Sequence, residues 1–115
     1  MSKKILTISI ATILATCLSS GLALAKEEHT SAALEHATAA AAATDAAGVS
    51  AHATEALKHT EPAKTAHAPH PDVVKHIEEG ELHLNAAVET AGKGDAAGAA
   101  KHANEAKTHL EAADK

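Results

Sequence analysis

Alanine supplies most of the apolar residues of this chain, and this excess constrains the fold more than any other feature. Twenty-seven alanines lie between residue 26 and the end of the 115-residue chain, which contains no Phe, Tyr or Trp. Alanine has the strongest helix propensity, but its side chain buries little apolar area. We therefore expect an all-α protein with a thin core, to which a ligand that bridges helices would add stability.

The first 25 residues have the pattern of an export signal. Lys3 and Lys4 precede the apolar residues 5–24, and Ala23-Leu24-Ala25 forms a cleavage site of the A-x-A type. We predict that the protein is exported and that the signal peptide, residues 1–25, is cleaved after Ala25. An uncut membrane anchor is the alternative, but the apolar stretch is barely long enough to span a bilayer.

The only cysteine, Cys17, lies within the predicted signal peptide. Its surroundings resemble a lipoprotein cleavage box only weakly, because Thr16 is a poor residue before the cysteine, so lipidation is a minor alternative. The remaining chain, residues 26–115, is expected to form one His-rich helical domain. Without cysteine, this domain has no disulfides, thiolate metal sites or cysteine nucleophiles.

The charge of residues 26–115 excludes nucleic acid as a partner. This segment has 8 Lys, no Arg and 15 Asp or Glu, a net charge of −7 with neutral histidines. An acidic surface repels phosphate backbones and attracts cations, and stacking on bases needs aromatic residues or Arg. We expect a monomer that binds divalent metal ions and has no stable membrane association after cleavage.

Turn and capping residues divide the domain into four helical segments. We expect these at about residues 30–44, 50–60, 72–91 and 95–113. Pro62 is expected to end the second segment, because proline removes a helix hydrogen bond, and a linker over residues 61–71 follows. Asp72 and Asp95 are the predicted N-caps of the last two helices.

Two stretches of the domain, fifty residues apart, share most of their residues. Residues 45–59 and 95–109 are identical at nine of fifteen aligned positions, including Asp-Ala-Ala-Gly at the start of each. Each copy belongs to a helical hairpin, and two stacked hairpins make a four-helix bundle. We therefore predict an up-down four-helix bundle of two duplicated hairpins. An unfolded Ala-rich tail is the alternative, since the core is thin.

Eight of the ten histidines form pairs with a seven-residue spacing. The pairs are His29 with His36, His52 with His59, His76 with His83, and His102 with His109. A seven-residue step turns a helix through about 700°, so both members share one face about 10.5 Å apart. Two such histidines cannot bind one ion, because metal to nitrogen is about 2 Å. The spacing therefore predicts two layers of ligands, shared between helices.

A glutamate lies within three of these pairs, three residues after the first histidine and four before the second. The glutamates are Glu55, Glu79 and Glu105, and Ala32 takes the corresponding place in the first pair. This spacing puts the carboxylate within reach of both histidines of its helix. Imidazole with carboxylate suits Cu(II), Zn(II) and Ni(II), and Cu(II) is favoured on intrinsic affinity. We predict that the eight paired histidines and these three glutamates bind metal.

The helical phase predicts where these side chains lie. The expected apolar stripes are Val73, Ile77, Leu84 and Val88 in the third helix, and Ala99, Ala103, Ala106, Leu110 and Ala113 in the fourth. The paired histidines lie about 70° to one side of such a stripe, at the edge of the core. In antiparallel hairpins His36 would face His52, His29 would face His59, His83 would face His102, and His76 would face His109. His67 and His70 lie on the linker, as a weak site or as solvated side chains.

Two other functional classes compete with metal binding. A di-iron enzyme would use Glu-x-x-His elements in the bundle core, whereas this chain has His-x-x-Glu at the core edge and no aromatic residue. We therefore expect no enzyme. The second alternative is a metal-independent helical envelope stress or chaperone-like protein, in which the histidines are only surface polar residues.

Short segments around the histidines follow a common pattern. They are Val74-Lys75-His76-Ile77-Glu78-Glu79-Gly80 and Ala100-Lys101-His102-Ala103-Asn104-Glu105-Ala106, and a Lys-His dipeptide recurs at residues 58, 75 and 101. These segments resemble the small metal-binding protein family, which comprises short, His-rich, periplasmic four-helix bundles built from KHAxEA-type repeats. The resemblance covers essentially all of residues 26–115. It implies binding of several divalent ions, Cu(II) above all, with Ni(II) or Zn(II) as alternatives, for metal buffering, storage or detoxification.

Overall fold

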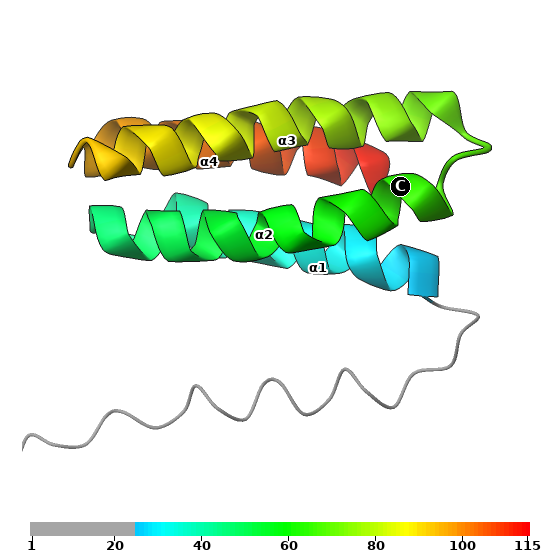
Figure 1. The fold of residues 1–115 in the computed structure, drawn as a ribbon, viewed down its shortest axis with the longest axis horizontal. Helices are drawn as coiled ribbons and strands as arrows, with labels where there is room; N and C mark the ends of the chain where they lie inside the picture. Colours follow the sequence, from blue (N-terminus) through cyan, green and yellow to red (C-terminus); the bar gives the residue numbers. More distant parts are fainter. Residues whose placement is uncertain (1–24) are drawn as a thin grey trace, which may run out of the picture.

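The structure is a computed structural model that describes residues 25–115, with side chains from residue 28. This part of the chain forms four helices. In chain order they are α1 (Ala25–Ala42), α2 (Ala46–Ala66), α3 (Pro71–Gly92) and α4 (Ala96–Ala113). Consecutive helices run in opposite directions, so that α1 with α2 and α3 with α4 form two hairpins lying side by side (Figure 1). The predicted all-α, up-down four-helix bundle is confirmed.

The N-terminal predictions fall on residues 1–24, which lie outside the described part of the chain. Cleavage after Ala25 and the alternative of lipidation at Cys17 therefore stay predictions. Among the helices that the structure describes, none combines the length and the hydropathy that crossing a bilayer requires.

Alanine dominates the core. The largest fully buried apolar side chains are Ile77, Leu84, Leu110 and Val49. The alanines that are also buried are Ala33, Ala37, Ala40, Ala53, Ala56, Ala63, Ala87, Ala91, Ala99, Ala103, Ala106 and Ala113. Because a methyl group buries little area, this core contributes less hydrophobic stabilisation than one of the same size built from Leu and Ile.

The apolar stripe predicted for α4 is buried at every position, whereas the stripe predicted for α3 needs correction. In α3, Ile77 and Leu84 are buried, but Val73 and Val88 are only half-buried. Gly80, Ala87 and Ala91 are the other buried residues of this helix. Three of the five buried residues of α3 are therefore small, and the two valines lie at the edge of the buried face.

Gly80 marks a close approach of α3 to α4. A Cβ atom at this position would lie 3.0 Å from Cγ of Leu110 and 3.5 Å from the carbonyl oxygen of Ala106. Glycine lowers helix propensity, and the sequence therefore predicts a local weakness here. The structure shows the compensating gain, because the missing side chain makes room for Leu110, which is fully buried.

The predicted bounds of the second helix are wrong at both ends. This helix begins at Ala46, with the carboxylate of Asp45 accepting a hydrogen bond of 2.7 Å from the Gly48 amide, as an N-cap does. It then continues through Pro62 to Ala66. Ala63, directly after the proline, packs in a small cluster with Ile77 and Ala113. Tertiary packing therefore outweighs the hydrogen bond that proline removes.

The turn between α2 and α3 is correspondingly shorter than the predicted linker. His70, not Asp72, is the N-cap residue of α3, and Pro71 takes the first helical position, where its missing N–H costs nothing. Asp72 lies in the first turn, where a carboxylate interacts favourably with the helix dipole. The predicted N-cap of α4 is confirmed, since Asp95 accepts a hydrogen bond of 2.9 Å from the Gly98 amide.

A polar contact joins the two hairpins between α2 and α3. Glu81 accepts hydrogen bonds from the Thr60 hydroxyl at 2.8 Å and from the Lys64 ammonium at 3.1 Å. Lys64 also pairs with Glu61 at 2.7 Å, and the hydrogen bond to Glu61, followed by that to Glu81, raises the Lys64 pKa above its usual value. Because Thr60 is buried and satisfied, this contact favours one docking of the hairpins.

Candidate metal centre

The four histidines of the second hairpin form one continuous row of imidazoles between α3 and α4. The ring centroids are 6.2 Å apart for His76 and His109, and 6.2 Å apart for His83 and His102. The middle pair, His83 and His109, is stacked at 5.4 Å with only 10° between the ring planes. The order along this second-hairpin row is therefore His76, His109, His83, His102.

The first hairpin repeats this arrangement between α1 and α2. Ring centroids are 5.5 Å apart for His29 and His59 and 6.3 Å apart for His36 and His52. The middle pair, His36 and His59, is stacked at 5.7 Å with 8° between the planes. All four pairings predicted across the hairpins are therefore found, and this first-hairpin row runs in the order His29, His59, His36, His52.

The middle contact of each row is not part of the sequence-based prediction, which placed the histidines in two separate layers. Neighbouring rings lie 5.4–6.3 Å apart, roughly half of the about 10.5 Å spacing within one helix. The two helices are thus staggered, and their side chains interdigitate as ridges and grooves do. The equal seven-residue spacing on both helices is compatible with this stagger, but it does not select the stagger over facing pairs.

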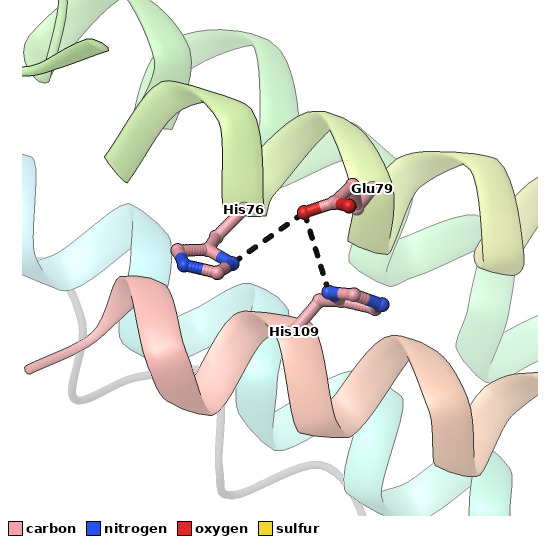
Figure 2. A group of neighbouring side chains, drawn as sticks. All are labelled: His76, Glu79 and His109. Carbon is pink, nitrogen blue, oxygen red and sulfur yellow. Dashed lines mark ion pairs between the residues drawn. The ribbon is translucent and has the colours of Figure 1, made fainter. Parts of the chain in front are cut away.

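Glu79 connects the first two rings of the second-hairpin row (Figure 2). Its Oε2 atom lies 3.5 Å from Nδ1 of His76, on the same helix, and 3.5 Å from Nδ1 of His109, on α4. The three side chains point toward one another, and all are half-buried. Their ligand atoms lie within 4.8 Å of one another, so small side-chain movements can bring them around one ion.

Glu105 has the same role at the other end of the row. Its Oε1 atom lies 3.2 Å from Nδ1 of His83 across the hairpin and 3.5 Å from Nδ1 of His102 on its own helix. These three residues form a second half-buried group whose ligand atoms lie within 4.8 Å of one another. Each glutamate therefore contacts the preceding histidine of its own helix and one across the hairpin, whereas the sequence spacing had placed it between two histidines of one helix.

The burial and hydrogen bonding of two imidazole nitrogens agree with a role as metal ligands. Within the described part of the chain, Nδ1 of His76 and Nδ1 of His102 are buried and make no hydrogen bond. The carboxylates of Glu79 and Glu105 lie 3.5 Å from these nitrogens without forming a hydrogen bond, and a bound cation would satisfy both groups. Two neutral imidazoles with one carboxylate also match the donor types that Cu(II), Zn(II) and Ni(II) accept. The donor set, its spacing and the two unsatisfied atoms thus agree with metal binding.

In the first hairpin, Glu55 makes no ion pair with a histidine of the described chain. Glu55 pairs with Lys58 at 2.8 Å, and this hydrogen bond lowers the Glu55 pKa below its usual value. Ala32 occupies the position that corresponds to Glu79, as the sequence predicts. His36 and His59 lower the Glu55 pKa further, so this carboxylate lies near the first-hairpin row although it pairs with Lys58. A cavity of about 170 Å³ borders the same row and is lined by Glu28, His29, Ala32 and His59.

The imidazoles of the first-hairpin row influence one another electrostatically. Nδ1 of His29 lies 3.2 Å from Nδ1 of His59. Burial lowers the pKa of His59 below its usual 6.5, and the nearby His36 and His29 lower it further because neighbouring positive charges repel. His59 is thus held in the neutral form, which is the form that binds metal.

His67 and His70 lie apart from both rows. They flank the short turn between α2 and α3 rather than an extended linker, and their ring centroids are 6.5 Å apart. Nε2 of His67 lies 3.2 Å from the hydroxyl of Thr30, which ties the turn to α1. This contact gives His67 a structural role that the sequence did not indicate.

The chain as a whole matches a known protein family. The family model described as "Small metal-binding protein" matches residues 2–113, nearly the whole chain. The chain belongs to the small metal-binding protein family. The resemblance inferred from the Lys-His segments is therefore confirmed. No curated protein and no solved structure was found to match the chain significantly.

Proposed function

We propose that this family member is a non-enzymatic, periplasmic protein that binds divalent metal ions, chiefly Cu(II), in metal buffering, storage or detoxification. The observation that carries this proposal is the pair of half-buried groups His76, Glu79, His109 and His83, His102, Glu105. Family membership supports metal as the ligand. Ni(II) and Zn(II) are the alternative ions.

The surroundings of the two groups suit exchangeable cargo better than a resident cofactor. All six side chains are half-buried, so an ion reaches them from solvent without opening the core. Each group offers two imidazoles and one carboxylate and leaves further coordination positions open, so the protein imposes little geometry on the ion. Intrinsic affinity then decides among the ions, and it places Cu(II) above Ni(II) and Zn(II).

Calorimetric titration of the purified chain with Cu(II) and with Zn(II), with helicity followed in parallel, tests this proposal. The decisive variant replaces His76, His83, His102 and His109 with Gln, and the control replaces His67 and His70. We expect the first variant to lose the tightest binding and the control to retain it. Affinity of the unaltered chain no better than that of an unstructured peptide with equally many histidines would contradict specific sites.

Export and physiological role need separate tests. The signal-like pattern of residues 1–25 supports a periplasmic location, and the mass of the protein recovered from its native envelope tests cleavage after Ala25. Elemental analysis of the same material identifies the metal it carries. If replacing all eight paired histidines leaves growth under copper stress unchanged, the alternative of a metal-independent envelope stress or chaperone-like protein is favoured.

A further inference from the structure

The two hairpins have nearly the same row of imidazoles, and one of the residues that differ beside it is in contact with a glutamate of the row. Lys58 in α2 and Thr108 in α4 occupy corresponding positions, fifty residues apart, and each directly precedes the last histidine of its helix. Both side chains are exposed. The glutamate three residues before each of them is conserved between the two copies, as Glu55 and Glu105.

The contacts of these two glutamates differ accordingly. Glu105 faces the imidazoles, with Oε1 at 3.2 Å from Nδ1 of His83. Glu55 instead accepts a hydrogen bond of 2.8 Å from the Lys58 ammonium, and within the described chain no ion pair joins it to a histidine. The Thr108 hydroxyl donates to the carbonyl oxygen of Asn104 at 3.2 Å, so it leaves Glu105 available to the imidazoles.

We propose that Lys58 is an internal competitor of the metal ion, and that it makes the first hairpin the weaker of two graded binding sites. The proposal rests on the proposed metal-binding function and adds an order of filling to it. A dication that uses Glu55 must displace the ammonium from the carboxylate and remain near a positive charge. At the second hairpin the carboxylate need not be freed first, because Thr108 is uncharged and no ion pair joins Glu105 to a lysine in the described chain.

The competition is modest, because it involves a partly exposed ion pair. The side chains of Lys58 and Glu55 are 63% and 46% exposed, so water screens their attraction. Removing the lysine should therefore raise the affinity of the first hairpin about threefold to tenfold, a range that corresponds to one exposed ion pair and one nearby charge. Lys58 thus only adjusts the affinity of the first hairpin, and its imidazoles bind the ion whether or not Glu55 is available.

A reciprocal exchange of the two residues tests the proposal. Lys58→Thr gives the first hairpin the second hairpin's residue, and Thr108→Lys does the reverse. Lys93→Thr is the matched control, because it removes one exposed lysine from the turn between α3 and α4. Zn(II) is the probe, since it is diamagnetic, and imidazole resonances in ¹H–¹⁵N spectra report each histidine of the full chain separately.

In the unaltered protein, we expect His83 and His102 to respond at lower Zn(II) concentration than His36 and His52. Lys58→Thr should lower the concentration at which His36 and His52 respond about threefold to tenfold, and Thr108→Lys should raise that of His83 and His102 similarly. If both variants match Lys93→Thr, the competitor proposal is wrong while metal binding stands. If no imidazole of the unaltered protein responds to Zn(II), the proposed function itself fails.

Discussion

A single carboxylate distinguishes a stack of histidines from a candidate metal site in this protein. Imidazoles line both hairpins at similar distances, and Glu79 and Glu105 bring an anionic oxygen within 3.5 Å of those in the second hairpin. An anionic ligand compensates part of the charge of a dication, which neutral imidazoles cannot do. The glutamates therefore make the second-hairpin row, at both of its ends, the better candidate for holding a dication.

Replacing Glu79 with Gln tests this role directly. The amide of glutamine keeps the shape of the side chain but loses its charge. We therefore expect the affinity of the group around His76 and His109 for Cu(II) to fall at least about tenfold, which is the usual effect of altering a residue of a metal site. Calorimetry measures the change. Glu78→Gln is the matched control, because Glu78 is the exposed neighbour on the same helix. Equal affinities of the two variants would show that Glu79 is not a ligand.

The lowered pKa of His59 predicts how stability depends on pH without metal. In the unfolded chain His59 titrates at its usual pKa of 6.5, whereas in the folded protein burial holds the pKa below this value. As pH falls through this window, the unfolded state takes up the proton first, and stability decreases until the folded pKa is passed. Urea unfolding in the presence of a chelator at several pH values should therefore show a smaller loss for His59→Gln than for the unaltered protein. Parallel losses in both proteins would contradict the assignment.

Close helix contacts depend on small residues at particular positions, of which Gly80 is the clearest. The helix tolerates the poor propensity of glycine because Leu110 of α4 fills the space where a Cβ would lie. At the element scale, α3 and α4 thus approach closely along the same seam that holds the second-hairpin row. A larger residue at this position would push the two helices apart and with them His76 and His109.

Gly80→Leu should destabilise the protein by about 1–3 kcal/mol, the usual cost of overpacking a core. Urea unfolding of the metal-free protein measures this cost. Gly92→Ala provides the control, because no atom lies within 4 Å of a Cβ built there, and alanine favours helix. We expect Gly92→Ala to be neutral or slightly stabilising. An unchanged midpoint for Gly80→Leu would show that α3 and α4 are not so close.

The described part of the molecule consists of four long helices that bury few large apolar side chains. Its core consists of alanines around four larger apolar side chains, and the polar contact from Thr60 and Lys64 to Glu81 links α2 to α3. Such a bundle has a small reserve of stability. Ions bound between helices add to this reserve, since a ligand that binds only the folded state stabilises it by mass action.

Metal should therefore raise the melting temperature measurably. Free Zn(II) at a hundred times its dissociation constant stabilises the folded state by about 2.7 kcal/mol per site. For a domain of this size, that corresponds to a rise in Tm of about 10 °C or more. Thermal unfolding followed by circular dichroism, before and after addition of a chelator, measures the shift. The variant without its eight paired histidines should show no shift, and a shift of equal size there would argue against the histidine sites.

The fold class, the helical bundle and the partners of the paired histidines across each hairpin can be predicted from the sequence. These properties follow from local physics: alanine favours helix, aspartate caps it, and a seven-residue step returns to the same face of a helix. The same spacing shows that Ala32 takes the place that Glu79 has in the third helix. Family membership agrees with the resemblance found in the Lys-His segments.

How the helices meet, by contrast, depends on contacts between residues far apart in the sequence. The continuation of α2 through Pro62 depends on the burial of Ala63 against α3 and α4, which no local signal contains. The stagger that stacks His83 on His109 and turns Glu79 toward the neighbouring helix depends on how two surfaces interdigitate. Whether Glu55 contacts a histidine or Lys58 likewise required the positions of the side chains in space, because helical spacing puts both within its reach.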